Sequence, residues 1–396
     1  MAREMTPRER ILTALRGDVP DRVPVALRMS TFLNDIYGGG GRLAQLKAAK
    51  EFGTDVVMWE QLAPLYVWTQ HASYWDLPQV VVETMVRQGK HRLTTERTFH
   101  TPAGVLHDVV ERPCPGYVPG HVQSPMIVEP LIKDHADLEA LPFLFAPPSS
   151  LRLTHMATLR EIVGDHGFVE PTLHGPVDVQ AAELLHPNQR FLTLYYDDRE
   201  LMRRVLRICQ DAIMGYIQGI MEAGEKIIFI WWAYASQSYG WSPAIWREMF
   251  YPLIQEQVEL VHACGALYHY YDDGPVRNIL GYLRELRIDA LSTLTPPPMG
   301  DTTMSEYRRA IGGQAALMGG LDMIHGLMEG TPESVDAAVR QLIADGGPGG
   351  GYVLDVTNTI RTGTPVDNVK AAVKAARRYG RYDKMGHLPS ALGGGR

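Results

Sequence analysis

Cysteine is scarce in this chain: its three residues, Cys114, Cys209 and Cys264, are widely separated. This excludes a small secreted scaffold held by disulfides and favours a reducing compartment. No run approaches the ~18 apolar residues of a membrane-spanning helix, and the segment Met1–Pro7 holds no apolar signal region. The sequence therefore predicts a cytoplasmic protein without a membrane partner.

Positive charge is also limited, since 38 Lys and Arg stand against 45 Asp and Glu, a formal net charge of -7. Nucleic acids and anionic membranes are bound through basic patches, and the sequence contains none that we can identify. With 396 residues and 45% hydrophobic content, the chain is long enough for one large globular domain. These properties favour chemistry on a small molecule.

Apolar runs and helical patterns alternate along most of the chain. Residues 7–15 are an expected helix, with Thr6 as N-cap and Pro7 in its first turn, and residues 21–25 an expected first strand. Further strand-like runs follow helical patterns at 168–172, 226–231, 266–270, 290–292, 316–320 and 351–355. Serial alternation predicts an α/β fold with a parallel sheet, and about eight strands favour a (β/α)8 TIM-type barrel.

Residues 80–128, approximately, follow a different pattern. Short β-rich runs at 80–84, 92–99 and 105–110 are separated by Gly or Pro, which predicts a small antiparallel β insertion in the N-terminal third. We expect residues 1–388 to form a single barrel domain that includes this insertion. Residues 389–396, which contain three consecutive glycines, are expected to be a flexible tail.

The segment Leu267–Gly274, with the sequence LYHYYDDG, carries the clearest sign of chemistry. It reads as a buried strand that ends in two acids, and in α/β folds the loops after strand carboxyl ends hold ligands and catalytic groups. Because side chains alternate along a strand, His269, Tyr271 and Asp273 share one side. We expect these three to face the barrel interior as catalytic groups.

A second block, rich in aromatic residues, follows the expected strand at 226–231. Residues expected to bind substrate are Trp232, Tyr234, Gln237 and Tyr239 in this block, Trp59 near an earlier strand end, and Asn358 in the last loop. Flat rings suit an aromatic ligand, or a methylated ammonium held by cation–π attraction worth about 0.5–2 kcal/mol per ring. Trp231 directly continues the strand and is expected to pack the barrel.

Four blocks of sequence resemble the uroporphyrinogen decarboxylase-like superfamily, and together they span nearly the whole chain. They are Met5–Leu12 with Pro20–Val25, the turn His174–Pro176, the strand end Leu317–Asp322, and Gly330–Val335 before Gly349–Leu354 with Thr364–Val369. The resemblance implies a TIM-type barrel. It also implies one of two chemistries: decarboxylation of uroporphyrinogen, or zinc-dependent methyl transfer to or from a corrinoid on a partner protein.

The decarboxylase relatives bind eight carboxylates through an arginine-rich segment after the first strand. Here the corresponding segment, Val25–Leu33, offers only Arg28. This single arginine argues against uroporphyrinogen as the substrate. Arg28 is either a surface or capping residue, or it holds a smaller carboxylate together with His174.

The methyltransferase relatives bind zinc through a His-x-Cys-Gly motif and a later cysteine. Alignment on Gly274 puts Tyr271 in the histidine position and Asp273 in the cysteine position, and the last loop, Asp355–Ile360, lacks cysteine. A zinc site with thiolate ligands is thus absent. A metal site of His269, Asp273 and Asp355 is one interpretation. The alternative is that His269 is a core histidine and the acids cap the next helix.

Two enzyme classes remain. The first transfers a methyl group from a small methylated substrate, such as a methoxylated aromatic, to a corrinoid carrier. The second is a lyase or decarboxylase acting on a small carboxylate, in which Asp273 or Asp322 protonates or steadies a charged intermediate. Asp322 is otherwise a helix cap. A non-catalytic ligand-binding barrel is a third alternative, and the sequence does not distinguish a homodimer from a monomer.

Overall fold

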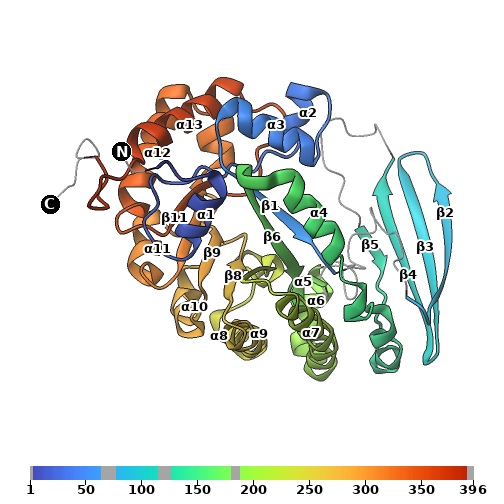
Figure 1. Ribbon diagram of the computed structural model, residues 1–396. Coiled ribbons are helices and arrows are strands. Elements are labelled where there is room, and N and C mark those ends of the chain that lie inside the picture. Colours follow the sequence, from blue (N-terminus) through green and yellow to red (C-terminus); the bar gives the residue numbers. More distant parts are fainter. Residues whose placement is uncertain (1–2, 64–76, 115–125, 180–187, 390–396) are drawn as a thin grey trace.

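The computed structural model describes residues 3–63, 77–114, 126–179 and 188–389. In this part of the chain a curved sheet of seven parallel strands is surrounded by helices (Figure 1). Its strands, in their order across the sheet, are β1 (Val56–Gln61), β6 (Gly167–His174), β7 (Ile227–Trp231), β8 (Leu267–Tyr271), β9 (Ala290–Thr293), β10 (Ala316–Leu321) and β11 (Tyr352–Val356). The predicted α/β class and the strand runs from residue 168 onward are confirmed.

The helices alternate with these strands. They are α1 (Pro7–Leu15), α2 (Phe32–Tyr37), α3 (Arg42–Phe52), α4 (Leu153–Val163), α5 (Pro176–Val179), α6 (Asn188–Asp197), α7 (Arg199–Glu222), α8 (Pro243–Met249), α9 (Tyr251–Ala263), α10 (Leu280–Leu286), α11 (Met304–Ile311), α12 (Pro332–Gly346) and α13 (Val366–Tyr379). Among the described helices, none has both the length and the apolar character needed to cross a bilayer.

An eighth strand in the full sense is not present in the described residues. Residues 23–29 run beside β11 and the loop after it: Val25 bridges Leu354 in β11, and Met29 bridges Ile360 in that loop. On the other side, the backbone N–H of Asp55 donates to the carbonyl of Val25 at 2.7 Å, just before β1 begins. The described residues therefore do not show the complete eight-stranded barrel that was predicted. The edge of β1 faces residues 23–30 across a boundary that we call the seam.

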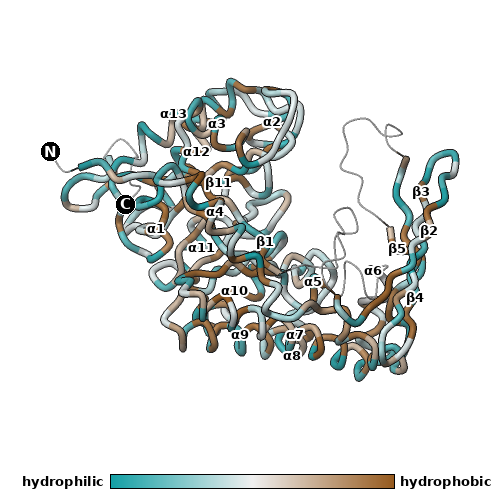
Figure 2. Tube along the Cα trace, turned by 45° about the vertical axis from the view of Figure 1, so that its right-hand side comes forward, coloured by the Kyte–Doolittle hydropathy of each residue, from teal (hydrophilic) through white to brown (hydrophobic). Residues whose placement is uncertain are grey.

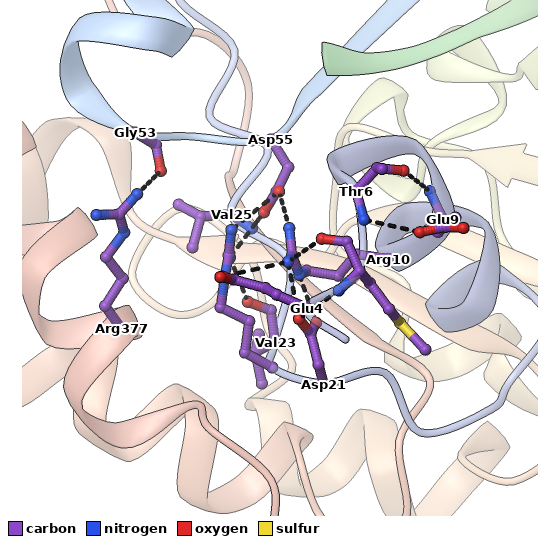
Figure 3. A network of polar contacts seen from close by, with 12 residues as sticks. Glu4, Thr6, Glu9, Arg10, Asp21, Val23, Val25, Gly53, Asp55 and Arg377 are labelled. Atoms are coloured by element: carbon purple, nitrogen blue, oxygen red, sulfur yellow. Dashed lines mark hydrogen bonds and ion pairs between the residues drawn. The ribbon is translucent and has the colours of Figure 1, made fainter. Parts of the chain in front are cut away.

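Hydrogen bonds and ion pairs of side chains stabilise the amino-terminal end of the seam (Figure 3). The buried carboxylate of Asp55 accepts hydrogen bonds from the backbone N–H of Val25 at 2.9 Å and from Arg10 at 2.6 Å and Arg22 at 2.8 Å. Arg10 also donates to Asp21 at 2.6 Å. Buried charges are stable when they are paired and hydrogen-bonded in this way. The first block that resembles the superfamily thus has a structural role, because it holds residues 23–29 against β1.

Helix α1 closes the amino-terminal end of the sheet's concave side. It begins at Pro7 after the N-cap Thr6, as predicted, and its buried Ile11, Ala14 and Leu15 face the sheet. They pack with inward side chains of the strands and of residue 26: Ala26, Phe168, Ile227, Ala290, Ala316, Met318 and Val353. This end is filled by a close-packed core, so space for a ligand remains toward the carboxyl ends of the strands.

The predicted β insertion is confirmed as a four-stranded antiparallel sheet. Its strands are β2 (Val81–Gln88), β3 (Arg92–Thr101), β4 (Gly104–Pro113) and β5 (Met126–Glu129). The sheet stands to one side of the helices (Figures 1 and 2). One of its faces is buried through Phe99, Leu106, Val110 and Ile127. The expected flexible tail falls almost entirely in residues 390–396, outside the described residues.

Candidate active site

A cavity of about 850 Å³ lies at the carboxyl ends of β1, β6 and β7 and continues along the seam. Side chains at the strand ends include Trp59, Gln61, Thr172, His174, Trp231 and Asn358; along the seam they include Arg28, Arg42, Gln45 and Glu60. Because β1 has no full ladder on this side, space remains between its edge and helix α3. The predicted positions of Trp59, His174, Arg28 and Asn358 in the site agree with this lining.

Flat side chains form one wall of the cavity. Trp59 stacks on Phe229 with ring centroids 4.6 Å apart, and Trp231 meets Trp59 edge-on at 6.0 Å. Trp231 also stacks on His174 at 5.4 Å, and the Arg28 guanidinium lies 4.9 Å from the centre of the Trp59 ring. Rings fixed by such contacts offer a rigid apolar surface to a planar ligand.

The buried carboxylate of Glu170, on β6, holds the side chains of this wall in place through hydrogen bonds. It accepts hydrogen bonds from the Trp59 indole N–H at 2.9 Å and pairs with His269 Nδ1 at 2.9 Å. His269 Nε2 lies 2.5 Å from the Ser292 hydroxyl, and both Glu170 and His269 are fully enclosed. His269 therefore faces the interior as predicted, but as a core histidine with both ring nitrogens occupied.

Tyr271 and Asp273 form a hydrogen-bonded pair at the end of β8. The Tyr271 phenol donates to the Asp273 carboxylate, and the Tyr271 ring lies 4.3 Å from the Trp231 ring in the cavity wall. Burial raises the pKa of the Asp273 carboxyl, while the Tyr271 hydrogen bond and the charge of Arg28 oppose the rise. Asp273 is thus a half-buried acid that holds its proton to a higher pH than a free aspartate.

Asp272 points to the opposite side of the chain, and sequence reasoning did not assign it a role. It accepts hydrogen bonds from the Tyr270 phenol at 3.0 Å and from the Gly274 N–H at 3.2 Å. A Cβ on Gly274 would lie 1.6 Å from the Ser236 hydroxyl, so this turn requires glycine. Burial raises the pKa of Asp272 well above its ordinary value.

Asp178, in α5, is a third buried acid near this turn and was also missed. Its carboxylate accepts a hydrogen bond from the backbone N–H of Tyr234 at 2.7 Å. Burial raises its pKa well above the ordinary value, and the negative charges of Asp273 and Asp272 add to the effect. We call Asp178, Asp272 and Asp273 the acid cluster. The charge of Asp273 disfavours ionisation of both Asp178 and Asp272, which adds to the effect of burial on the pKa of these two carboxyls.

Arg28 lies inside the site and is not a surface residue. Its Nε is 2.8 Å from the Asp355 carboxylate, which also accepts from the Arg28 backbone N–H at 3.0 Å. Burial raises the pKa of Asp355 to about 6, although Arg28 favours the ionised form. Arg42 and Arg152 also line the cavity. Local patterns could not reveal these two, because their place in the lining depends on how α3 and the residue before α4 pack beside the strand ends.

Trp232 requires a correction. Its side chain is fully buried and donates a hydrogen bond to the Tyr268 hydroxyl at 2.9 Å, so it packs in the core, whereas Trp231 lines the cavity. Alternation explains the exchange: Phe229 and Trp231 share the inner side of β7, and the next residue points outward.

The remaining predicted residues are not among those that line this cavity. The rings of Tyr234 and Tyr239 pack at 4.7 Å in the turns that follow β7, and Gln237 is half-buried between them in sequence. Asp322 accepts hydrogen bonds from the N–H groups of Ile324 and His325 at 2.8 and 3.0 Å, so it caps the short helix η9 (Met323–Met328). Its interpretation as a cap agrees with this geometry.

The predicted metal ligands are each engaged elsewhere. His269 is held by Glu170 and Ser292, Asp355 by Arg28, and Asp273 by Tyr271. In the described part of the chain, no three His, Cys, Asp or Glu side chains are grouped so that they could hold a metal ion. The described residues therefore do not fit a zinc site.

Curated relatives include members of both expected branches. This chain is 27% identical to a methylated-thiol–coenzyme M methyltransferase of Methanosarcina mazei over 203 residues. The match covers 50% of this chain and 51% of that protein. Over 56% of its length the chain is 26% identical to a methylcobamide:CoM methyltransferase of Methanosarcina barkeri, covering 61% of that protein. A uroporphyrinogen decarboxylase of Azoarcus sp. is 24% identical over 52% of the chain, covering 54% of it. The matches thus span little more than half of each relative.

A solved structure matches almost the whole chain. It is a methyltransferase from Methanosarcina mazei, with a TM-score of 0.62, 19% identity, and coverage of 95% of this chain and 99% of that one. At this identity the likeness establishes the fold alone. The family model described as Uroporphyrinogen decarboxylase (URO-D) matches residues 117–379. This match covers more than half of the sequence, and the protein therefore belongs to the uroporphyrinogen decarboxylase family.

Proposed function

We propose that the protein transfers a methyl group from a small methylated substrate to a corrinoid carried by a partner protein. A methoxylated aromatic carboxylate is the substrate class that the cavity fits best. The observation that carries the proposal is a half-buried acid, Asp273, hydrogen-bonded to Tyr271, whose ring packs 4.3 Å from that of Trp231 in the aromatic wall. The methyltransferase names of two curated relatives support it.

Substrate binding uses the flat wall and the cations around it. A planar ring would lie against Trp59 and Trp231, whose faces are held by Phe229 and His174. A carboxylate on that ring would face the arginines that line the cavity, Arg28, Arg42 and Arg152. Guanidinium groups match a planar carboxylate with two parallel hydrogen bonds, which also sets the orientation of the ring.

The reaction breaks the bond between the methyl carbon and the ether oxygen. A reduced corrinoid supplies the electron pair that accepts the methyl group, and the oxygen keeps the electrons of the broken bond. Asp273 gives its proton to this oxygen, so that the product leaves as a neutral phenol. Tyr271 holds the carboxyl in place, and Arg28 steadies the carboxylate that remains.

No zinc takes part in this scheme, because the residues in the corresponding positions do not fit a zinc site. In zinc-dependent chemistry the metal makes the substrate heteroatom a better leaving group. Proton donation from Asp273 serves the same purpose, since it neutralises the charge that develops on the oxygen. A proton donor in place of a metal ion suits an oxygen leaving group, which must be protonated or stabilised as it departs.

The proposal is tested with the purified protein, 3-methoxybenzoate and 4-methoxybenzoate, and a reduced corrinoid carrier protein. Methyl transfer is read from the visible spectrum of the corrinoid, and phenol release from chromatography. We expect methylation that depends on the substrate and on Asp273, with the Asp273→Asn variant as the negative control. Absence of methylated corrinoid with every methoxylated or otherwise methylated substrate would exclude methyl transfer.

A second candidate is a decarboxylase acting on a small carboxylate. It is favoured by the three arginines of the cavity, where the sequence indicated one. In this reaction Asp273 would protonate the carbon that loses carbon dioxide. Release of carbon dioxide from an aromatic carboxylate without any corrinoid, and its loss in Asp273→Asn, would favour this candidate over methyl transfer.

A further inference from the structure

Strand β2 (Val81–Gln88) is the outermost strand of the antiparallel sheet. The order of this sheet is β2-β3-β4-β5, so β2 pairs with β3 on one edge, and no described strand covers the other edge. Seven of its eight residues are exposed. A row of free backbone N–H and C=O groups on such an edge is a template for pairing with another chain.

β2 lacks most of the features that keep edge strands from pairing. Its ladder with β3 runs without a bulge from Val81 opposite His100 to Gln88 opposite Leu93, and the strand contains no proline or lysine. It exposes apolar side chains instead, Val81 by 65%, Val86 by 58% and Met85 by 52%. Its two charged residues, Glu83 and Arg87, have opposite signs. The register therefore decides whether opposite charges or like charges face each other when a second copy of the strand pairs with it.

Geometry limits the registers available to two copies of β2. In an antiparallel ladder, two directly opposed residues turn their backbone groups either both toward the partner strand or both away from it, and the two orientations alternate along a strand. When two identical strands pair around a two-fold axis, the axis must therefore pass through a residue and not between two residues. The central choices are Thr84, Met85 and Val86.

Only the register centred on Met85 joins opposite charges. It places Glu83 opposite Arg87 of the partner copy, and by symmetry Arg87 opposite Glu83, with the two Met85 side chains facing each other. Centring on Thr84 sets Glu83 against Met85, and centring on Val86 sets Arg87 against Met85. Glu83, Met85 and Arg87 lie on the same outer face, since all three have the same parity along the strand.

The side chains of Glu83 and Arg87 are accessible to a partner copy. Glu83 and Arg87 side chains are 73% and 64% exposed, and their ion-pair distances within the chain are long, 3.5 Å from Glu83 to His100 and 3.4 Å from Arg87 to Glu96. Arg87 already lies along Met85, with its guanidinium nitrogens 3.3 and 3.4 Å from the sulfur. The charged group is thus held over the outer face, where the partner's Glu83 would lie.

We propose that two copies of the chain form a homodimer through β2, paired antiparallel around Met85, so that the two four-stranded sheets join into one continuous sheet. The contact uses backbone hydrogen bonds for affinity and the two Glu83–Arg87 pairs for register. It lies on a different sheet from the strands that form the candidate active site, and it is independent of the function proposed above.

The test is sedimentation velocity of the full chain over a range of concentrations. The wild type is expected to show a monomer–dimer equilibrium. Glu83→Arg and Arg87→Glu each place like charges at both symmetric contacts, and each should raise the dissociation constant by roughly tenfold or more. The double variant E83R/R87E restores opposite charges and should return the constant to within about threefold of wild type.

Glu111→Arg is the matched control, because Glu111 lies on the same outer face but on β4, away from the free edge. It should leave the dissociation constant unchanged, and circular dichroism checks that every variant is folded. A wild type that stays monomeric at all concentrations would overturn the proposal. So would a dimer that is indifferent to both single charge reversals, or one that the double variant fails to restore.

Discussion

The Tyr271 phenol donates a hydrogen bond to the carboxylate of Asp273, two residues farther along the chain. Both side chains stand where strand β8 leaves the sheet, and burial keeps the pKa of each above its ordinary value. The relationship gives the site a positioned acid that holds its proton to a higher pH than a free aspartate. It also means that the two residues in the positions of metal ligands in relatives interact with each other.

Replacement of Asp273 by Asn should remove the proton donor while keeping the shape of the turn. General acid catalysis contributes about 10²–10⁴-fold, so kcat should fall by that factor with little change in KM. The measurement is steady-state turnover with the substrate that the corrinoid assay identifies. Asp367→Asn, a change at a highly exposed aspartate of α13, is the control and should keep full activity. Equal losses in both variants would contradict a catalytic role for Asp273.

The pH dependence of turnover should respond to Tyr271. Activity that requires protonated Asp273 falls as the pH rises through its raised pKa. The Tyr271 hydrogen bond favours the ionised form, so Tyr271→Phe should raise the pKa of Asp273 further and move the alkaline fall in kcat to higher pH. A pH–rate profile of both proteins checks this. An alkaline fall that stays in place or moves to lower pH would rule out Asp273 as the titrating acid.

Removal of Glu170 should destabilise the fold, because its carboxylate serves two buried partners. Glu170→Ala leaves the Trp59 N–H and His269 Nδ1 without their acceptor, and breaking a buried pair costs about 2–5 kcal/mol. The free energy of unfolding in urea measures the loss, with the exposed Glu161→Ala in α4 as control. A loss no larger than in the control would mean that water replaces the carboxylate.

Local patterns predicted the strands well, because each is a short apolar run bounded by turns. They failed where a role depends on distant residues. Glu170 lies in a run that indicates only a strand, and its pairing with His269 connects residues 99 positions apart. Trp232 was predicted to line the site because it belongs to an aromatic block. Alternation along β7 turns Trp231 toward the cavity and Trp232 into the core instead.

The absence of a full eighth strand from the described residues has a similar cause. Residues 21–25 have the apolar pattern of a strand, and they do lie between β11 and β1. Whether a full ladder forms depends on the packing of both neighbours, which the pattern does not contain. The cavity along the seam was therefore not predictable, and neither were Arg42 and Arg152 in its lining.

Asp355 should make stability depend on pH. Its folded-state pKa, raised to about 6 by burial, exceeds the unfolded value of about 3.9. The folded state binds the proton more tightly, so this contribution to stability is complete below the unfolded pKa and is lost as the pH rises through 6. The unfolding free energy of wild type relative to Asp355→Asn should therefore fall by up to about 3 kcal/mol between pH 4 and pH 7. Urea titrations at several pH values check this, and a difference that stays constant or grows with pH would contradict it.

Opening of the seam should be controlled by Asp55. Its carboxylate holds the Val25 N–H, Arg10 and Arg22, whereas Asp21 contacts Arg10 from the outer side and is partly exposed. Asp55→Asn should lower the unfolding free energy by about 3–5 kcal/mol, because the buried Arg10 and the partly buried Arg22 lose their partner's charge. Asp21→Asn is the matched control and should cost less, since Arg10 keeps Asp55. Hydrogen exchange localises the effect: peptides that contain residues 23–29 should exchange faster in Asp55→Asn, while those of β8 keep their protection at low denaturant. Uniformly faster exchange would mean that the network stabilises the whole fold and not the seam in particular.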